Sequence, residues 1–594
     1  MDDQKNFFMA MFLSGLVLLG YWFFIGKPMA EKARAQALLD AEKTAAVQVE
    51  STAPAPIESR ETLVARGNRI QIDSPAFKGS FLTTGSRFDD IALKEYNQTL
   101  NPEDGLVNLL SPEGAETSAY VMDNWTDLGG GTGANTPWAV ISGSTLTPST
   151  PIILGHETNG LSFKRTITLD DKFLITLSDK VTNTSSDEKE IRRKGVARQH
   201  TLPEGLTNFI VLQEGPISVI DNKYHDMRYK NIMFSKGINK ELEWSDTGQS
   251  GWVGLTDKYW LLGAIAPQGK TMTADYAYRT INDQEVYEVS YTLNPITLTA
   301  GATIESVGHI YVGAKERTLL KSYETDLGIA QMERAIDWGF FGIFVKPISW
   351  ALSKLGQLLG NYGLGILALT LVIKIILFPL FNKQYESQAK MKKVQPKLKK
   401  IQERYKDDRM KLQQEMMGLY KKEGVNPAAG CLPIIPTIFV FFSLYKSVFI
   451  NIDLRHQPFF GWIKDLSAKD PLSILNGFGA LPWDAVPLPF LGFFAIGPLA
   501  LMYGISMALM YTLTPQNPGG GEQAEMMAKM MKFMPWIFMF ILAPFATGLL
   551  VYWVWNNVLS FGQQYYITRK FKVDTPVDAF FRKITGKDKA ATSD

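Results

Sequence analysis

The sequence Gly363-Leu-Gly-Ile-Leu-Ala-Leu-Thr-Leu-Val-Ile-Lys374-Ile-Ile-Leu-Phe-Pro-Leu-Phe381 decides what class of protein this chain belongs to. Counted from Tyr362, the stretch is 20 residues long and carries one charged side chain, Lys374. As a helix it would be about 30 Å long, which matches the hydrocarbon core of a bilayer. We therefore predict a transmembrane helix over residues 362–381.

Lys374 lies about 4 Å from the middle of this predicted helix. A lysine at that depth costs roughly 2.5–3.5 kcal/mol to insert, and such residues usually face water or the protein interior and serve a function. The alternative is a lysine that snorkels to the headgroups. Because Lys383, the first cation past the helix, is about 13 Å further along, that boundary is beyond a lysine's reach. We predict a functional role for Lys374.

Length and composition set the outer limits of the interpretation. A chain of 594 residues is expected to hold more than one domain. The mean hydropathy of −0.04 averages a polar half and a strongly apolar half, and the net charge of +2 indicates no class of partner. Cys431 is the sole cysteine, so an intramolecular disulfide is excluded. An exported domain would therefore depend on its own hydrophobic core, for which about 300 residues suffice.

The N-terminal part of the chain predicts a membrane anchor and a linker. Residues 1–27 contain the apolar run Asn6 to Ile25, long enough to span, and we interpret it as an uncleaved signal anchor. A cleaved signal peptide is the alternative, although its apolar core would be shorter and followed by small residues. Residues 28–58 lack aromatic side chains and contain spaced prolines, which is typical of a linker.

Residues 59–335 have the pattern of a β-sandwich, because short alternating segments follow one another with turn residues between them. The alternation over residues 287–292 predicts a half-buried strand. Leu161 to Val181 predicts two strands joined at Asp170-Asp171. The glycine-rich segment 129–133 lacks the Gly-Lys-Ser/Thr ending of a phosphate-binding loop, so a plain turn is favoured.

Residues 336–360 predict an amphipathic helix before the first core span. Its apolar stripe falls at spacings of four, three and four residues: Ile348, Leu352, Leu355 and Leu359. Pro347 suits the first turn of such a helix. The helix would either lie along the membrane surface or be buried on protein, and the sequence favours neither.

Residues 361–570 predict a helical core of five spans. The expected spans are 362–381, 433–450, 494–513, 533–547 and 549–567, with a helical hairpin over 382–430. Residues 382–424 carry 13 Lys or Arg against 6 Asp or Glu, so the positive-inside rule places the hairpin in the cytoplasm. Each span carries the chain to the other side of the membrane. Counting the spans from the hairpin therefore places both termini and the basic tail 571–594 in the cytoplasm and residues 28–340 outside.

A wetted cavity in the core is the predicted functional site. The five predicted spans contain no Asp or Glu, so Lys374 has no carboxylate partner within them. An unpaired ammonium group in hydrocarbon is costly, which places Lys374 against water or polar groups. Thr370 lies one turn away on the same face, and the last span adds Tyr552, Trp553 and Asn556. Hydrogen bonding between helices is an equal alternative for the amide side chains of that span.

Further contacts are expected on the cytoplasmic side. Met391, Met416 and Lys570 are candidates for contact with a client chain or the ribosome, because flexible methionine surfaces bind varied apolar sequences. Ordinary helix packing is the alternative for the methionines. The five histidines are scattered and no HExxH, GxSxG or CxxC motif is present, so we predict no enzyme, no cofactor and no metal site. No specific nucleic-acid site is expected either.

Several segments resemble the YidC/Oxa/Alb family of membrane protein insertases, in its Gram-negative type. The matching segments are Gly251-Trp-Val-Gly-Leu-Thr-Asp-Lys-Tyr-Trp260, Tyr385-Glu-Ser-Gln-Ala-Lys-Met391, Asn426-Pro-Ala-Ala-Gly-Cys-Leu-Pro433, Phe533-Met-Pro535 and Gly548-Leu-Leu-Val-Tyr552. The resemblance implies a periplasmic β-supersandwich and a five-helix core with a hydrophilic groove open to cytoplasm and lipid. It implies that Lys374 stands where the family usually has arginine, that Thr370 is a groove residue, and that Tyr552-Trp553 replaces two tyrosines.

The function expected from these features is the insertion and folding of inner-membrane proteins. The expected partners are nascent membrane-protein clients, the ribosome, membrane lipids and, from the resemblance, the Sec translocon. One alternative is a secondary transporter that binds a small anion at Lys374, although the core shows no inverted repeat. Another is a chaperone that only packs helices already inserted.

Overall fold

The structure is a computed structural model that describes residues 57–127, 131–203, 205–207, 212–234, 242–281, 284–405, 408–424, 434–481, 495–513, 522–573, 575, 577 and 578. The predicted anchor 1–27, nearly all of the linker 28–58, the segment around Cys431 and most of the tail 571–594 lie outside these residues. The described chain divides into two compact units. The larger holds the β-sandwich and most of the helices, and the smaller holds residues 393–424 and 522–533.

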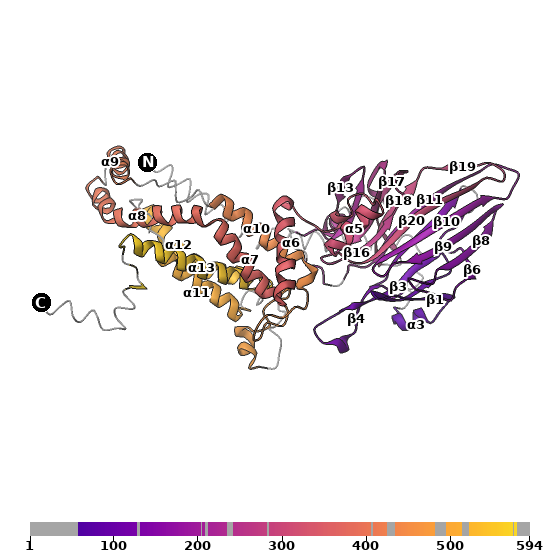
Figure 1. Cartoon of the computed structure of the whole chain (residues 1–594), viewed down its shortest axis with the longest axis horizontal. Helices are drawn as coiled ribbons and strands as arrows, with labels where there is room; N and C mark the ends of the chain where they lie inside the picture. Colours follow the sequence, from indigo (N-terminus) through magenta and orange to yellow (C-terminus); the bar gives the residue numbers. More distant parts are fainter. Residues whose placement is uncertain are drawn as a thin grey trace, which may run out of the picture. The chain divides into compact units, whose positions relative to one another are not determined.

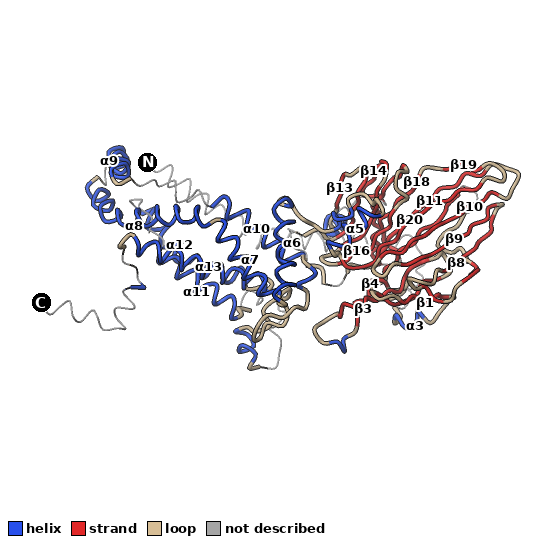
Figure 2. The backbone as a smooth tube through the Cα atoms, viewed as in Figure 1, coloured by secondary structure: helices blue, strands red, loops and turns tan. Residues whose placement is uncertain are grey.

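Two antiparallel sheets face each other in the larger unit (Figures 1 and 2). Within the described residues, the first sheet has eleven strands and runs β14 (Leu242–Gln249), β17 (Thr271–Ile281), β18 (Gln284–Leu293), β11 (Lys189–His200), β5 (Ala119–Asp127), β3 (Arg87–Asn97), β2 (Phe77–Leu82), β1 (Arg69–Asp73), β7 (Thr145–Leu146), with β19 (Ile296–Leu298) on β11 and β4 (Leu106–Leu110) on β3. The second has nine: β13 (Lys223–Asp226), β12 (Gly215–Ile220), β15 (Gly251–Thr256), β16 (Trp260–Ile265), β20 (Thr303–Ala314), β10 (Leu174–Asn183), β9 (Leu161–Leu169), β8 (Ile152–Thr158), β6 (Ala139–Ser142). The parallel β1–β7 contact is the exception to the antiparallel pairing.

The predicted β-sandwich is confirmed, and its local turn chemistry is visible. β9 and β10 pair across the predicted turn, where the carboxylate of Asp170 accepts hydrogen bonds from the backbone N–H groups of Lys172 and Leu174. The half-burial expected for β18 is wrong, because residues 286–291 are buried on both faces. Glu288 is tolerated there because the Arg198 guanidinium donates to it, with Nε at 2.8 Å.

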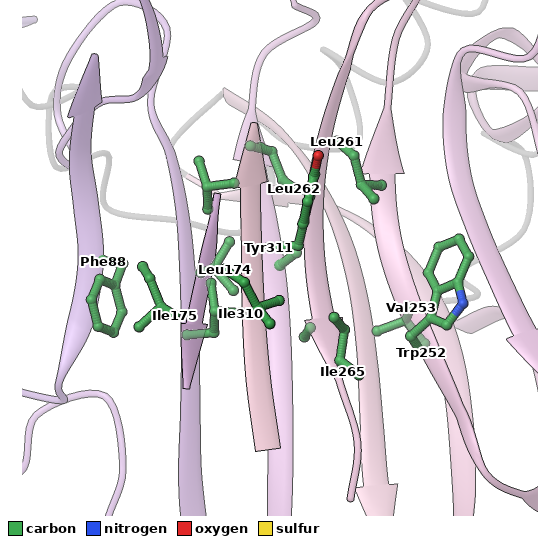
Figure 3. Close-up of a cluster of buried hydrophobic side chains, with 14 of the residues drawn as sticks. Phe88, Leu174, Ile175, Trp252, Val253, Leu261, Leu262, Ile265, Ile310 and Tyr311 are labelled. Atoms are coloured by element: carbon green, nitrogen blue, oxygen red, sulfur yellow. The ribbon is translucent and has the colours of Figure 1, made fainter. Parts of the chain in front are cut away.

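The core of the sandwich is close-packed between the two sheets. Figure 3 shows Phe88 of the first sheet beside Ile175, with Leu174, Ile310 and Ile265 following across the second sheet. All of these side chains are buried, so the domain carries its own hydrophobic core without a disulfide.

A cluster of two arginines and two aspartates crosses the same core. Arg193 on β11 donates to Asp123 on β5 at 2.7 Å, and Arg165 on β9 donates to Asp179 on β10 at 2.7 Å. Trp125 of the first sheet donates its indole N–H to Asp179 at 2.8 Å, which ties the sheets together. Burial alone would raise the pKa of Asp179, but the two arginines outweigh that effect and lower its pKa.

The remaining described helices follow the sandwich. They are α5 (Arg317–Asp326), α6 (Gly342–Leu359), α7 (Tyr362–Ile376), α8 (Phe378–Arg404), α9 (Arg409–Lys422), α10 (Ile434–Ile450), α11 (Pro498–Leu513), α12 (Glu522–Leu542) and α13 (Thr547–Lys570). Short helices α3 (Arg60–Val64) and α4 (Tyr229–Phe234) belong to the sandwich region. In the smaller unit, Asp408 caps the N-terminus of α9 by accepting from the N–H of Lys411, and Lys397 pairs with Glu423 at 2.6 Å.

The first core span departs from its prediction. The sequence predicts one helix over 362–381, whereas α7 ends at Ile376 and α8 leaves at an angle of 70°. Pro379 explains the break, because it cannot donate to the carbonyl of residue 375 and its ring would clash with that carbonyl. The Leu377 carbonyl instead accepts from the N–H of Phe381, which starts α8.

A bilayer crossing needs a helix that is both long and apolar. Within the described ranges, no helix taken alone is both long enough and apolar enough, while the bent pair α7 and α8 meets both conditions together. Residues Pro436–Ile450 and Pro498–Leu513 are apolar but shorter.

Helix α6 begins at Gly342, inside the predicted range of 336–360, and the predicted first-turn position of Pro347 is wrong. Since the helix begins at Gly342, Pro347 lies in its second turn and leaves the Ile343 carbonyl without its helical donor. The buried face runs through Val345, Ser349, Leu352 and Gly356, so it is rotated from the predicted stripe.

The ionic cluster should control the stability of the sandwich. Asp179→Leu would strand the buried guanidinium of Arg165, a change that typically costs about 3–5 kcal/mol. The measurement is urea unfolding of the full chain in detergent, followed by tryptophan fluorescence. The matched control is Asp187→Leu on the exposed surface, and Arg165→Met combined with Asp179→Leu should recover part of the loss. Equal midpoints for the two single variants would contradict the role assigned to the cluster.

Candidate functional site

A cavity of about 420 Å³ lies among α7, α8, α10, α11 and α13. Its polar lining comes from four of these helices: Thr370, Lys374, Gln384, Tyr385, Gln388, Thr437, Tyr552, Asn556, Asn557, Ser560 and Gln564. Apolar side chains of α7, α8, α10 and α11 complete it, among them Ile373, Phe381, Phe441 and Met510. The cavity therefore combines hydrogen-bonding groups with apolar walls in the helical part of the chain.

Lys374 is the cationic group in this lining. Its ammonium donates to the hydroxyl of Ser560 at 2.5 Å, and that hydroxyl donates to the Asn556 carbonyl at 2.6 Å. The ammonium also lies 4.6 Å from the centre of the Phe381 ring, a cation–π contact. No Asp or Glu is among the described residues that line the cavity. The positive charge is thus solvated by a hydroxyl and an aromatic face, and not neutralised.

The break between α7 and α8 shapes the cavity. A straight helix through Phe381 would carry residues 384–388 away along the axis of α7. The 70° bend at Leu377 instead brings Gln384, Tyr385 and Gln388 into the lining together with Lys374. Lys374 and the polar side chains of α8 consequently line the same cavity.

Most of the predicted groove residues line this cavity. Thr370, Tyr552 and Asn556 line the cavity with Lys374. The Thr370 hydroxyl donates to the Ile366 carbonyl of its own helix at 2.7 Å, so its hydrogen is used within α7. Trp553 is outside the lining, and its ring stacks at 5.6 Å on Phe441, which does line it.

The predicted client or ribosome contacts do not belong to this cavity. Met391 is half-buried on α8, and Lys570 is exposed at the end of α13. Met416 is half-buried on α9 in the smaller unit. None of these three side chains is among the lining residues, and their roles remain predictions.

Sequence reasoning missed the contribution of α8. The sequence assigns Tyr385 and Gln388 to the predicted hairpin 382–430 that follows the span. The available signal was Gln384 and Gln388, four residues apart, which is the spacing of one helix face. Gln388 accepts a hydrogen bond from Gln564 of α13 at 2.9 Å, which fixes the two helices at this end of the cavity.

No metal site competes with this interpretation in the part of the chain that the structure describes. There, no group of three His, Cys, Asp or Glu side chains has the arrangement needed to hold a metal ion. Hydroxyls, amides, two phenols and one ammonium group make the cavity suited to binding anionic or polar groups non-covalently.

Known proteins match this chain along nearly all of its length. A model of the YidC periplasmic domain matches residues 69–351, and a model of the 60Kd inner membrane protein matches residues 354–574. The membrane protein insertase YidC of Maricaulis maris (strain MCS10) is 40% identical over 602 residues, covering 99% of either chain. That of Dinoroseobacter shibae (strain DSM 16493 / NCIMB 14021 / DFL 12) is 41% identical over 620 residues, covering 99% of this chain and all of its own.

A crystal structure of an active YidC insertase, with its first transmembrane domain resolved, also shows similarity. It covers 85% of this chain and 96% of its own at 16% identity, with a TM-score of 0.34. At that score the likeness carries no weight beside the sequence matches.

The hydrogen bond between Lys374 and Ser560 should be measurable. Ser560→Ala removes the hydroxyl acceptor of a largely enclosed ammonium group, and hydrogen bonds to charged groups contribute about 1.5–3 kcal/mol. We expect a lower melting temperature in detergent, and a smaller loss when Lys374→Met is already present. Ser447→Ala, which removes a buried serine on α10 bonded to the Val345 carbonyl, is the control. Equal losses with and without Lys374 would contradict the assigned contact.

Proposed function

This chain belongs to the YidC family of membrane protein insertases, and on that premise we propose that the cavity around Lys374 receives polar segments of its clients. The chain is accordingly a bacterial inner-membrane protein with a periplasmic β-sandwich followed by a helical core. Its activity is the insertion of membrane proteins, which moves polypeptide from water into lipid. No bond in the client needs to be made or broken for this.

The observation that carries the proposal is an unneutralised cation in a polar cavity among apolar helices. Lys374 contacts a hydroxyl and an aromatic ring, and none of the described lining residues is a carboxylate. A short acidic or polar client tail that enters the cavity would gain charge-assisted hydrogen bonds before it meets hydrocarbon. The apolar distance left to cross would then be shorter, and the barrier to crossing lower.

Apolar surface next to the cavity supports the second half of the process. Ile375 and Ile376 on α7 are 63% and 69% exposed, and Ile505 on α11 is 52% exposed. Large exposed apolar surfaces mark contacts with a membrane or a partner, so these helix faces are suited to lipid or to a client helix. The apolar part of a client would leave the cavity along such a face while its polar tail passes on.

The proposed topology follows the charge distribution of the sequence. Both termini, the hairpin and the basic tail lie in the cytoplasm, and residues 28–340 lie in the periplasm. In this arrangement α9, with Met416, and the end of α13, with Lys570, would meet the ribosome or the emerging chain. Cooperation with the Sec translocon is part of the same proposal.

The transporter alternative is not favoured, because the full-length relatives of this chain are named insertases. A chaperone that acts only on helices already in the membrane would not need a charged cavity. The two experiments below separate insertion from both alternatives.

Charge reversal at Lys374 should change which clients are inserted. Lys374→Glu is expected to slow insertion of a client with an acidic tail by about tenfold, which requires only about 1.4 kcal/mol of lost attraction and new repulsion. The measurement is the insertion rate in proteoliposomes for two clients that differ only in tail charge. Lys374→Arg should keep the rate, and Lys354→Glu, an exposed lysine on α6, is the charge-matched control. Equal slowing of both clients would remove the charge attraction from the proposal.

Site-specific crosslinking should catch a client inside the cavity. Photo-crosslinkers at positions 370, 374 and 552 are expected to label a stalled nascent chain at its polar tail, before its apolar segment is inserted. A crosslinker at position 350, where Trp350 is exposed on α6, is the control and should not label the tail. If labelling appears only after insertion is complete, the chain acts as a folding chaperone and the cavity is not an entry route.

A further inference from the structure

A second cavity, of about 790 Å³, lies where the β-sandwich meets the helical core. One wall comes from the sandwich side, with Tyr224 of β13 and Arg228 just after it. The floor is the connecting segment from residue 334 to residue 341 and the first turn of α6. The other wall is α10, through Phe442 and Lys446. The cavity is distinct from the one around Lys374, since the two have no lining residue in common.

The lining of this cavity is cationic. Four basic side chains line it, against the two carboxylates of Asp226 and Asp337: Arg228, Arg334, Lys346 and Lys446. Asp337 is already occupied, because it accepts from Lys446 at 2.7 Å and from the backbone N–H of Gln213 at 2.8 Å. The positive excess persists after this pairing, so an anion would be attracted to the cavity.

The ion pairs nearby hold this lining in place. Lys346 donates to Glu333 at 2.9 Å, and Arg317 donates to the same carboxylate at 2.9 Å. Even with these two additional residues counted, five cations face three carboxylates. Gly339 adopts a φ of +65°, and a Cβ there would lie 3.8 Å from the Lys446 ammonium nitrogen. At that separation a Cβ would make only ordinary van der Waals contact, so the positive φ, and not the neighbouring charge, favours glycine at this position.

Large apolar side chains continue the cavity outward. Phe340 and Ile343, which line the cavity, are 96% and 79% exposed, and Phe442 is 41% exposed. Below them, Phe341 and Phe344 pack against Phe439 of α10 at 5.2 and 5.4 Å between ring centres. Neighbouring exposed apolar side chains of this size mark a contact with a partner or a membrane, and Trp and Tyr are enriched at the membrane interface.

We propose that this cavity binds the headgroup of an anionic glycerophospholipid, with the phosphate among the four basic side chains and the acyl chains along Phe340 and Ile343. A free phosphate ion would use the basic residues alone and leave the exposed apolar rim unexplained. An acidic peptide would also leave the rim in water. A phospholipid combines the two chemistries that the lining offers, side by side, at the boundary between a soluble domain and apolar helices.

Lipid binding in this cavity would affect the link between the β-sandwich and the helical core. The same segment that lines the cavity connects β20 and α5 to α6, and it is attached to α10 through Asp337 and Lys446. A bound lipid would fill the space between the base of the sandwich and α10. The attachment of the periplasmic domain would then depend on the anionic lipid content of the outer leaflet.

The test is lipid binding to the delipidated full-length chain in detergent, measured by native mass spectrometry. Phosphatidylglycerol, phosphatidylcholine with the same acyl chains and soluble glycerol phosphate are titrated separately. We expect phosphatidylglycerol to bind about tenfold more tightly than phosphatidylcholine, and the double variant Arg228→Gln, Arg334→Gln to lose that preference. The charge-matched control is Lys223→Gln, Lys230→Gln, whose lysines are exposed on the sandwich outside the lining, and it should keep the preference.

A second variant keeps the proposal falsifiable if the arginine variant folds poorly. Phe340→Ser alters an almost fully exposed side chain, so the melting temperature should be unchanged. It is expected to weaken both phospholipids equally and to leave their ratio as in the parent chain. Equal binding of the two phospholipids by the parent chain would overturn the proposal. So would glycerol phosphate binding as tightly as phosphatidylglycerol, since that assigns the cavity to a free phosphate. Insertion is not measured, so the result does not depend on the proposed mechanism at Lys374.

Discussion

The energetic cost of one ammonium group among apolar helices organises the helical core. Lys374 cannot be neutralised there, because no described residue lining its cavity carries a carboxylate. Its charge must therefore be solvated by neutral groups, and the structure supplies the Ser560 hydroxyl and the Phe381 ring. Phe381 can reach back to Lys374 because the chain turns at Leu377 and α8 begins there. The bend caused by Pro379 and the polar face of α13 together meet this requirement.

The β-sandwich also contains buried arginines, but there each of them is paired with a carboxylate. Arg165 and Arg193 are completely buried, but each has a carboxylate partner within 2.7 Å. A buried pair of this kind is costly to break and is satisfied internally, so it has nothing to offer a ligand. Lys374 is different because its charge is solvated and unpaired. Burial alone therefore does not favour a functional role for a cation, and the absence of a counter-charge among the described lining residues is what supports the proposed role of Lys374.

Hydropathy and residue spacing were sufficient to predict the β-sandwich, the paired strands β9 and β10, and Lys374 as a cation within an apolar helix. These features depend on local patterns, such as an alternating strand or a charge within an apolar run. The bend at Leu377 depends on Phe378-Pro379, a dipeptide that is compatible both with a kinked helix and with a new one. The sequence alone does not choose between these, so the contribution of Tyr385 and Gln388 was missed.

The structure also differs from the sequence prediction in β18 and α6, where tertiary contacts override the local sequence pattern. β18 shows the alternation of a half-exposed strand, yet Glu288 is buried because Arg198 of the neighbouring strand pairs with it. The buried face of α6 is set by the close approach of α7, where a Cβ on Gly365 would lie 2.8 Å from the backbone nitrogen of Gly356. A glycine pair of this kind permits close packing, and it rotates α6 away from the stripe that its leucines suggest.

The two cavities together show how charge is divided along the chain. The described lining of one cavity holds a single cation, Lys374, and that of the other holds several, among them Arg228 and Lys446. Both cavities are bordered by exposed apolar side chains. Asp337 partly neutralises the second, whereas among the described lining residues the first has no such partner. A partly neutralised site with several long basic side chains is suited to a resident anion that stays bound. A site with one unpaired cation is suited to an anion that binds only transiently, because a single contact can be released again.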